Sequence, residues 1–357
     1  MNNQNEAACA AKKTSIGGQA LIEGVMMRGP EKTAMAVRHT SGEIVMEEWP
    51  TKGKERPRIT KWPFIRGVIN MVESMAMGYK CLMRSAELSG LDAEESADDA
   101  RRRAEKQAKK AAKKAEKDGT TPPTVEEILA NEAEKKEPTK GEKVLFTVAM
   151  VISVILGVGL AVVLFMWLPI FLYNTVLKGL FPALAKPQFR WIQSVFEGVV
   201  RLAIFIGYVA LVSLMKDIRR VFMYHGAEHK SIFCYEKGLP LTVENVRAQS
   251  RFHPRCGTSF LVLALIVGIL VSLCVPIYDN TLLRAAVKLL LIPVVVAVGY
   301  ELIKLAGRRD NAFTRFISKP GLWVQRLTTK EPDDDMIECA IASLTAVIPE
   351  DPEADKW

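Results

Sequence analysis

Long apolar stretches alternate with highly charged ones along this chain. No residue between Lys143 and Lys178 is charged, whereas about half of those between Leu91 and Lys143 are. A helix that crosses the hydrocarbon core of a bilayer, which is about 30 Å thick, needs about 20 mostly apolar residues. Four stretches meet this requirement and predict membrane-spanning helices: Val144–Tyr173, Trp191–Met215, Cys256–Tyr278 and Ala285–Ala306.

Two of these stretches carry charged residues. The second contains Glu197 and Arg201, and the fourth contains Lys288, Glu301 and Lys304. Most of these residues lie near the ends of their stretch, where long side chains reach the interface. Glu197 and Arg201 also have the i,i+4 spacing of a pair on one helix face. The prediction therefore remains four spans.

The distribution of Lys and Arg predicts the orientation, because cytoplasmic loops carry an excess of both. The connection from Met215 to Cys256 holds eight of them, and the tail from Lys304 to Lys330 holds seven. The two connections on the opposite side hold three and two. We therefore expect a multi-pass protein of the cell membrane with both termini in the cytoplasm and the lipid bilayer as its surroundings.

The region from residue 15 to residue 90 has the pattern of a small folded unit. The apolar-rich runs Ala34–His39 and Glu43–Trp49 flank Thr40-Ser41-Gly42, which predicts a β-hairpin. From Phe64 to Leu88 apolar residues recur at helical spacing, which predicts an amphipathic helix. The fold class is thus mainly α, a polytopic membrane protein with a small N-terminal α+β cytoplasmic region.

The remaining segments complete the predicted organisation. We expect a disordered N-terminus over residues 1–14 and a solvated charged linker or insertion over 91–143, whose Ala/Lys/Arg-rich part lacks an apolar face. The membrane domain covers 144–306 and includes a cytoplasmic loop at 216–258. A cytoplasmic tail with a short helix follows over 307–357.

Composition narrows the function classes. The net charge of +8 suits anionic lipid or nucleic acid, but the basic runs have no aromatic interleaving or recognition motif, so no specific nucleic-acid partner is expected. The six cysteines are scattered and form no disulfide framework. Oligomeric state is not fixed by these features.

The segment Ser15–Pro30 contains four glycines, a proline, one acid, Glu23, and one base, Arg28. Glycines permit tight turns and close backbone approach, which a binding loop would use. A strand between two turns explains the same pattern. Its spacing is neither a P-loop nor a dinucleotide fingerprint, so it predicts no phosphate site.

Three of the four histidines lie in the central loop. His225 and His229 have the i,i+4 spacing that places both imidazoles on one helix face, and His253 and Cys256 add a nitrogen and a thiolate just before the third span. Together they are a plausible ligand set for zinc or another divalent transition metal. Histidines at a membrane surface also bind lipid phosphates or protein carbonyls, so the pattern has a non-metal explanation too.

Glu228 makes this loop a candidate for chemistry. His225-x-x-Glu228-His229 matches the H-x-x-E-H pattern, in which the glutamate acts as general base toward water at zinc. Glu301, near the cytoplasmic end of the fourth span, is a further candidate ligand or base, although an acid there more often pairs with a neighbour such as Lys304.

Four blocks of sequence resemble the bacterial YqhQ-like membrane protein family of unknown function: Gly17–Gly29, His225–His229, His253–Ser259 and Pro320–Thr329. The resemblance covers nearly the whole chain apart from the charged insertion. It implies an integral membrane protein and a predicted metal-dependent enzyme, whose metal label maps onto His225, His229, His253 and Cys256, with Glu228 beside them.

Two hypotheses of different classes follow. The first is a metal-dependent enzyme, with hydrolysis as the reaction class, which acts at the cytoplasmic face on a lipid-linked or membrane-protein substrate. The second is a non-catalytic scaffold or assembly factor whose metal, if present, only folds the central loop. Loss of activity with retained metal in a Glu228→Gln variant separates the two.

Overall fold

The computed structural model describes most of the chain outside the charged segment. The described residues are 13–51, 62–91, 140–186, 189–274, 281–308, 311–351 and 353–356, with isolated positions and short stretches at 57, 60 and between 101 and 128. Most of the predicted disordered N-terminus and of the predicted 91–143 linker lies outside them. Thr14 is already part of the fold, because it forms an antiparallel bridge with Lys356.

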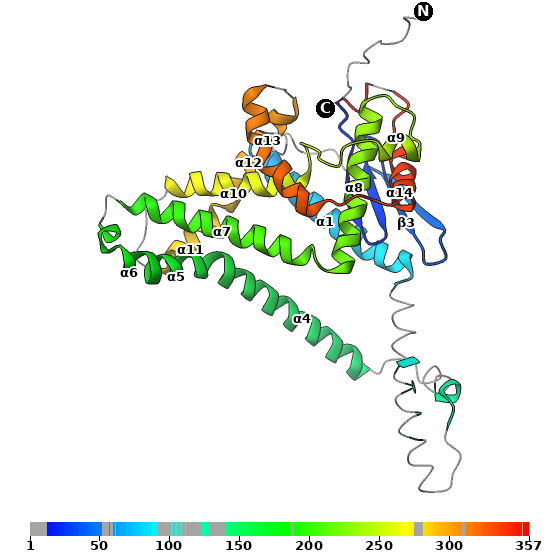
Figure 1. Ribbon diagram of the computed structural model, residues 1–357, viewed down its shortest axis with the longest axis horizontal. Helices are drawn as coiled ribbons and strands as arrows, with labels where there is room; N and C mark the ends of the chain where they lie inside the picture. The colour runs from blue at the N-terminus through cyan, green and yellow to red at the C-terminus, as the bar shows by residue number, and fades with distance from the viewer. Residues whose placement is uncertain are drawn as a thin grey trace, which may run out of the picture. The chain divides into compact units, whose positions relative to one another are not determined.

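Four strands near the N-terminus form one antiparallel sheet in the order β1-β2-β3-β4 (Figure 1). β3 and β4 match the predicted hairpin, with Gly42 between them at φ +89°. β1 and β2 occupy the glycine-rich segment, which is therefore a second hairpin rather than a single strand between turns. The strands are β1 (Gly17–Leu21), β2 (Gly24–Arg28), β3 (Lys32–Arg38) and β4 (Ile44–Pro50).

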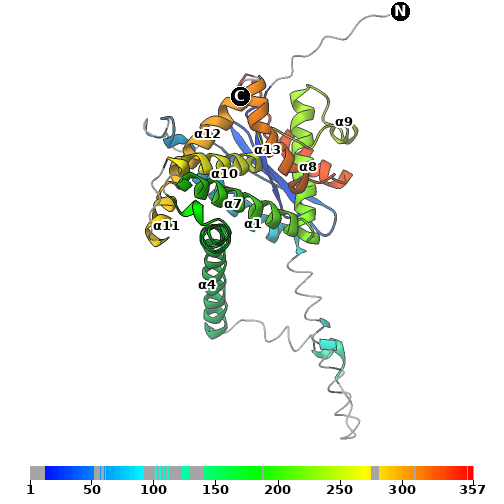
Figure 2. The same cartoon turned by 60° about the vertical axis from the view of Figure 1, so that its left-hand side comes forward.

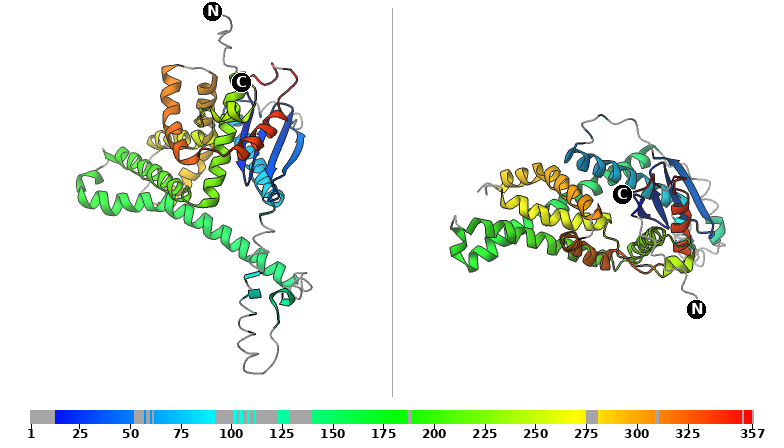
Figure 3. Two further views of the ribbon diagram at one scale, coloured as in Figure 1. Left: turned by 45° about the vertical axis from the view of Figure 1, so that its right-hand side comes forward. Right: turned by 90° about the horizontal axis from the view of Figure 1, so that it is seen from above.

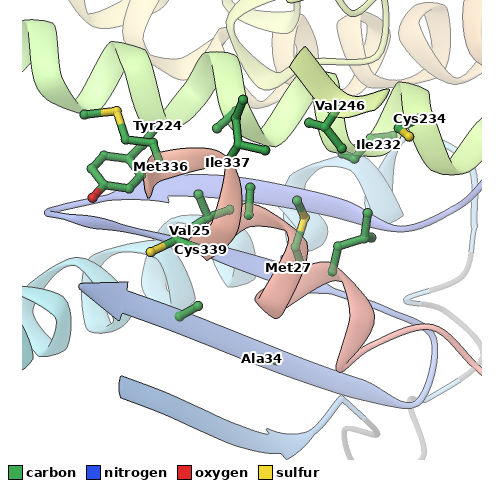
Figure 4. Packing of buried hydrophobic residues seen from close by; sticks show 14 of the residues in the cluster. Val25, Met27, Ala34, Tyr224, Ile232, Cys234, Val246, Met336, Ile337 and Cys339 are labelled. Atoms are coloured by element: carbon green, nitrogen blue, oxygen red, sulfur yellow. The ribbon is translucent and has the colours of Figure 1, made fainter. Parts of the chain in front are cut away.

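One face of the sheet carries the main hydrophobic core (Figure 4). Helices α8 (Lys216–Glu236) and α14 (Asp334–Thr345) pack there, through residues such as Tyr224 and Ile337, against alternate side chains of β2 and β3. Figure 3 shows α14 lying against the strands. The predicted short helix of the tail is thus α14, and it belongs to the core of the N-terminal sheet.

The opposite face of the sheet packs on α1 (Ile65–Ser89), which confirms the predicted amphipathic helix. Cys81 of α1 is buried against Leu21 and Met35. Other apolar residues of α1 remain exposed, including Val72, Met75, Tyr79 and Met83.

Helices α7, α10, α12 and α13 lie beside one another (Figure 2). α10 packs against α7, α12 and α13, and at one of these crossings Gly321 of α13 leaves room for Ser259 of α10. The elements are α7 (Arg190–Val212), α9 (Val243–Arg247), α10 (Gly257–Leu273), α11 (Thr281–Leu290), α12 (Ile292–Arg308) and α13 (Ala312–Thr328).

Three helical segments among the described residues are long and apolar enough to cross a membrane: Val148–Leu180, Trp191–Val212 and Ala286–Ala306. The first includes residues 148–162 of α4 (Lys140–Val162). The third of the four predicted spans corresponds to α10, an apolar helix of 17 residues. A helix of that length rises only about 25 Å, short of the hydrocarbon thickness of about 30 Å.

α13 is a helix that the sequence pattern did not predict. Asn311 and Thr314 form a capping box at its start, and Pro320 lies inside it. A proline inside a helical pattern normally indicates a helix end. The tail therefore contains two helices instead of one.

Candidate metal centre

The candidate site is built around α8, as the i,i+4 spacing predicts. His225 and His229 lie one helical turn apart with ring centroids 4.4 Å from each other, and Glu228 and His229 are buried. Gly226 allows a close crossing, because a Cβ atom at this position would lie 2.1 Å from the carbonyl oxygen of Lys330. The absence of a side chain at Gly226 thus allows the segment after α13 to lie against the site.

Cys256 approaches these histidines from the N-terminus of α10. It is the N-cap residue of that helix, and its sulfur accepts a hydrogen bond from the Thr258 N–H at 3.4 Å. Its Sγ lies 3.1 Å from Nε2 of His225. Ligand atoms of His225, His229 and Cys256 all lie within 4.8 Å of one another.

Backbone carbonyls orient both imidazole rings. Nδ1 of His225 lies 2.8 Å from the carbonyl oxygen of Thr328, and Nδ1 of His229 lies 2.5 Å from that of Arg251. A donated Nδ1–H leaves Nε2 as the lone-pair nitrogen, which is the tautomer that metal-binding histidines commonly adopt. Both Nε2 atoms are therefore available on the side of Cys256.

Two polar atoms at this place lack partners. Within the described residues, Nε2 of His229 and Oε2 of Glu228 are buried and accept or donate no hydrogen bond. Buried polar groups are nearly always paired, so such atoms require an explanation, of which an ion or a water is one.

The electrostatics of the site favour a positive charge between the ligand atoms. Burial alone would lower the pKa of His225, but the Cys256 thiolate and Glu228 raise it to about 9. Burial alone would raise the pKa of Cys256, yet His225 and His229 hold it well below its ordinary range. Burial raises the pKa of Glu228, although the two histidines oppose this effect.

The structure does not bring His253 into this three-residue group, although the sequence predicts it as a fourth ligand. Its Nε2 faces Glu236 at 3.7 Å and Arg255 at 3.3 Å, and its ring is tilted against that of His229 with centroids 5.6 Å apart. His253 and Cys256 are close in sequence but lie in an irregular segment, so sequence spacing did not fix the direction of either side chain.

The other three predicted candidates lie outside the cluster, and two of them form ion pairs. Glu301 forms a two-pronged ion pair with Arg66 at 2.8 and 2.5 Å, which joins α12 to α1. Glu23, at φ +51° in the β1–β2 turn, binds Arg220 of α8. Arg28 ends β2 and lines a separate cavity of about 310 Å³ against α1.

Some residues that shape the site were not predicted. Gln325 of α13 is fully buried; its side chain accepts from the His253 N–H at 2.8 Å and donates to the His253 carbonyl at 2.7 Å. Gly18 of β1 donates its N–H to Glu228, and a Cβ there would lie 2.9 Å from Cγ of Glu228. Both residues lie in the sequence blocks that carry the family resemblance. Membership of these blocks is the signal by which the sequence could have identified them.

A cavity of about 510 Å³ opens beside the cluster. Its walls come from α8, from the start of α10 and from β1, and they include His225, Glu228, His229 and Cys256. This volume falls within the range of small-ligand pockets, roughly 300–1,000 Å³. The cluster is thus accessible to a second molecule.

Comparison with known proteins agrees with the sequence resemblance. Residues 62–350 match the family model described as "Protein of unknown function (DUF1385)". The chain is 35% identical over 338 residues to "Uncharacterized protein YqhQ" of Bacillus subtilis (strain 168), which covers 94% of this chain and 92% of that protein. No solved structure matches. The chain therefore belongs to the DUF1385 family of proteins of unknown function.

Proposed function

We propose that this protein is a membrane-bound, metal-dependent hydrolase whose metal, preferably zinc, is held by His225, His229 and Cys256. The observation that carries the proposal is the convergence of two Nε2 atoms and one Sγ within 4.8 Å. Two imidazoles and a thiolate suit zinc in particular. The unpartnered Nε2 of His229 supports the assignment, because a metal ion would satisfy it.

A set of three ligands next to a cavity favours catalysis over a structural role. Structural zinc sites usually use four protein ligands, whereas catalytic sites keep a fourth position for water or substrate. Zinc held by three protein ligands lowers the pKa of water and polarises carbonyl groups. A metal that only folds the loop, as in the scaffold hypothesis, would be expected to have four protein ligands and no open position.

Glu228 is the proposed general base. Its carboxylate lies among the candidate ligands, with Oε1 positioned through the Gly18 N–H and Oε2 without a partner. The oriented carboxylate would accept a proton from water and return it to the leaving group. His253, Glu236 and Arg255 would fix the wall of the site without touching the reacting atoms.

The membrane topology completes the proposal. α10 corresponds to the third of the four proposed spans, and the Lys and Arg excess of the 216–258 connection supports a site on the cytoplasmic face. A substrate carried by the bilayer, either a membrane protein or a lipid-linked molecule, would reach the cavity beside the start of α10.

The Cys256–His225 contact supports a second candidate function. A cysteine 3.1 Å from an imidazole, at the N-terminus of a helix, has the surroundings of a nucleophilic thiolate. In that case the thiolate would attack a carbonyl group directly. Metal content separates the two candidates, because only the first needs an ion.

The test is elemental analysis of the protein purified in mild detergent without chelators. We expect about one equivalent of zinc or another transition metal per chain, lost in the His225→Ala/His229→Ala double variant. His39→Ala, at the β3–β4 turn, and Cys274→Ser are matched controls that should retain it. Absence of metal, including after reconstitution with zinc, would overturn the metal proposal and favour the thiolate.

A further inference from the structure

β1 is an edge strand, and the side of it opposite β2 faces the candidate site. The sheet order places it at one end, with β2 as its only neighbouring strand. Leu21 and Gly24 close a two-residue turn and form a hydrogen-bonded pair, so the N–H of Gly18, three residues earlier, points away from β2 and toward Glu228. N–H groups alternate in direction along an antiparallel strand, so the N–H of Ala20 points to the same outer side.

This outer side forms part of the cavity wall. Residues 17–20 line the cavity together with His225, Glu228 and Cys256. Gly17 and Gly18 present backbone without side chains, and Gly17 is exposed. The outward-facing backbone N–H and carbonyl groups of residues 17–20 thus lie next to the proposed catalytic groups.

We propose that the substrate is an extended polypeptide segment that adds to the outer edge of β1. This inference rests on the proposed hydrolase function and names its substrate class. In strand addition, main-chain hydrogen bonds supply affinity and alternate side chains occupy pockets. The N–H of Ala20 would bind a carbonyl of the added segment and hold a neighbouring peptide bond beside Glu228.

The reaction would be hydrolysis of that peptide bond. The oxygen of water forms a bond to the carbonyl carbon and the C–N bond breaks. Glu228 takes one proton from the water and delivers it to the departing amine, so that one carboxyl and one amino group result. No oxidant, reductant or further reactant is required.

The cavity fits a peptide better than a lipid phosphate. Arg255 is the one Lys or Arg among the described residues that line it, and it is ion-paired with buried Glu236. A phosphate group would need a cation that is not already engaged in this way. The repeating N–H and carbonyl groups of β1 instead match the backbone of an extended chain.

A proline at position 20 tests the inference, because it removes the outer N–H and leaves the N–H groups that face β2. Met46→Pro is the matched control. It lies on β4, the other edge strand. The N–H of Thr51 bonds to the carbonyl oxygen of Glu31, so the N–H groups of odd-numbered residues in β4 face β3, and the N–H of Met46 points outward. Both variants are compared with the parent by thermal unfolding before use.

The measurement is peptide capture on immobilised Glu228→Gln protein loaded with zinc. The probe is a tryptic digest of a bacterial proteome, and retained peptides are identified by mass spectrometry. We expect Ala20→Pro to reduce retention about tenfold, the loss expected for one backbone hydrogen bond at the upper end of its range. Met46→Pro should retain the same peptides as the parent.

A retained peptide is then resynthesised with single N-methyl groups at successive positions. Strand addition predicts that binding is lost at alternate residues only, because alternate N–H groups face β1. Retention that is unaffected by Ala20→Pro, N-methyl effects without this alternation, or no retained peptide would overturn the inference. The zinc content of the same samples separates the failure of this inference from the failure of the proposed function. Bound zinc without peptide capture would overturn only the peptide substrate, whereas missing zinc would overturn the proposed metal-dependent function.

Discussion

At the scale of single residues, the site is defined by atoms that lack their usual partners. Nε2 of His229 and Oε2 of Glu228 are buried without hydrogen bonds in the described part of the chain, while the Nδ1 atoms of both histidines are held by carbonyls. An unpaired buried polar group costs about 1–3 kcal/mol. A ligand bound to these two atoms would remove this cost.

The Glu228→Gln substitution separates catalysis from metal binding. We expect unchanged zinc content and a fall in the hydrolysis rate of a captured peptide by about 10²–10⁴-fold, because the amide cannot accept the proton from water. Glu244→Gln, on α9 and outside the cavity, is the control that should keep both properties. If Glu228→Gln loses the metal instead, Glu228 is a ligand.

Gly226→Ala tests the close crossing at the site. The added Cβ would lie 2.1 Å from the Lys330 carbonyl oxygen, so the two segments must separate, at a cost of about 1–3 kcal/mol of unfolding free energy. Gly257→Ala is the matched control, because no atom lies within 4 Å of its Cβ position. Thermal unfolding in detergent compares them; equal stability of the two variants would contradict the described crossing.

At the scale of elements, the helical spacing of His225 and His229 correctly predicted that their rings lie together on one face of α8, because periodicity fixes which side chains share a helix face. The same reasoning does not extend to His253, which precedes α10 in an irregular segment and faces Glu236. It also missed α13, since Pro320 indicates a break in a helical pattern. Gln325 could not be predicted as a partner of His253, because 72 residues separate them.

Thr14 before β1, the end of α8 and the segment before α10 meet at Glu236. Its carboxylate accepts the Thr14 N–H at 2.9 Å and pairs with Arg255. Burial alone would raise its pKa, but His253 and Arg255 hold it below the ordinary 4.5. The stability that this carboxylate contributes is therefore fully present above about pH 4.5 and is lost as the pH falls through the lower folded-state pKa.

Glu236→Gln should accordingly lower the thermal unfolding temperature most at neutral pH. The difference from the parent should shrink as the pH falls below 4.5, where the parent carboxylate becomes protonated. Unfolding curves at successive pH values check this. A difference that is constant across the range, or that grows in acid, would show that the pKa is not depressed.

At the scale of the whole molecule, the apolar pattern predicted a mainly helical membrane protein, and three segments are long and apolar enough to cross a bilayer. The third predicted span, Cys256–Tyr278, is not among these three segments, because its helix α10 has 17 residues, and it packs among α7, α12 and α13. Apolarity alone does not distinguish a helix surrounded by protein from one surrounded by lipid.

The proposed topology places Cys274, after the end of α10, on the side of the membrane opposite the metal site. Cys274 is exposed, so a membrane-impermeant thiol reagent should label it in intact cells. The Cys274→Ser variant should then show no labelling until the membrane is opened. Labelling of Cys274 only after permeabilisation would contradict the four-span arrangement.

X-ray absorption spectroscopy of the zinc-loaded protein in detergent tests the proposed metal centre directly. We expect one sulfur ligand at about 2.3 Å and two imidazole nitrogens at about 2.0–2.1 Å. The sulfur contribution should disappear in Cys256→Ser and persist in Cys274→Ser. Zinc without a sulfur ligand, or a sulfur signal unchanged by Cys256→Ser, would contradict the metal centre at His225, His229 and Cys256.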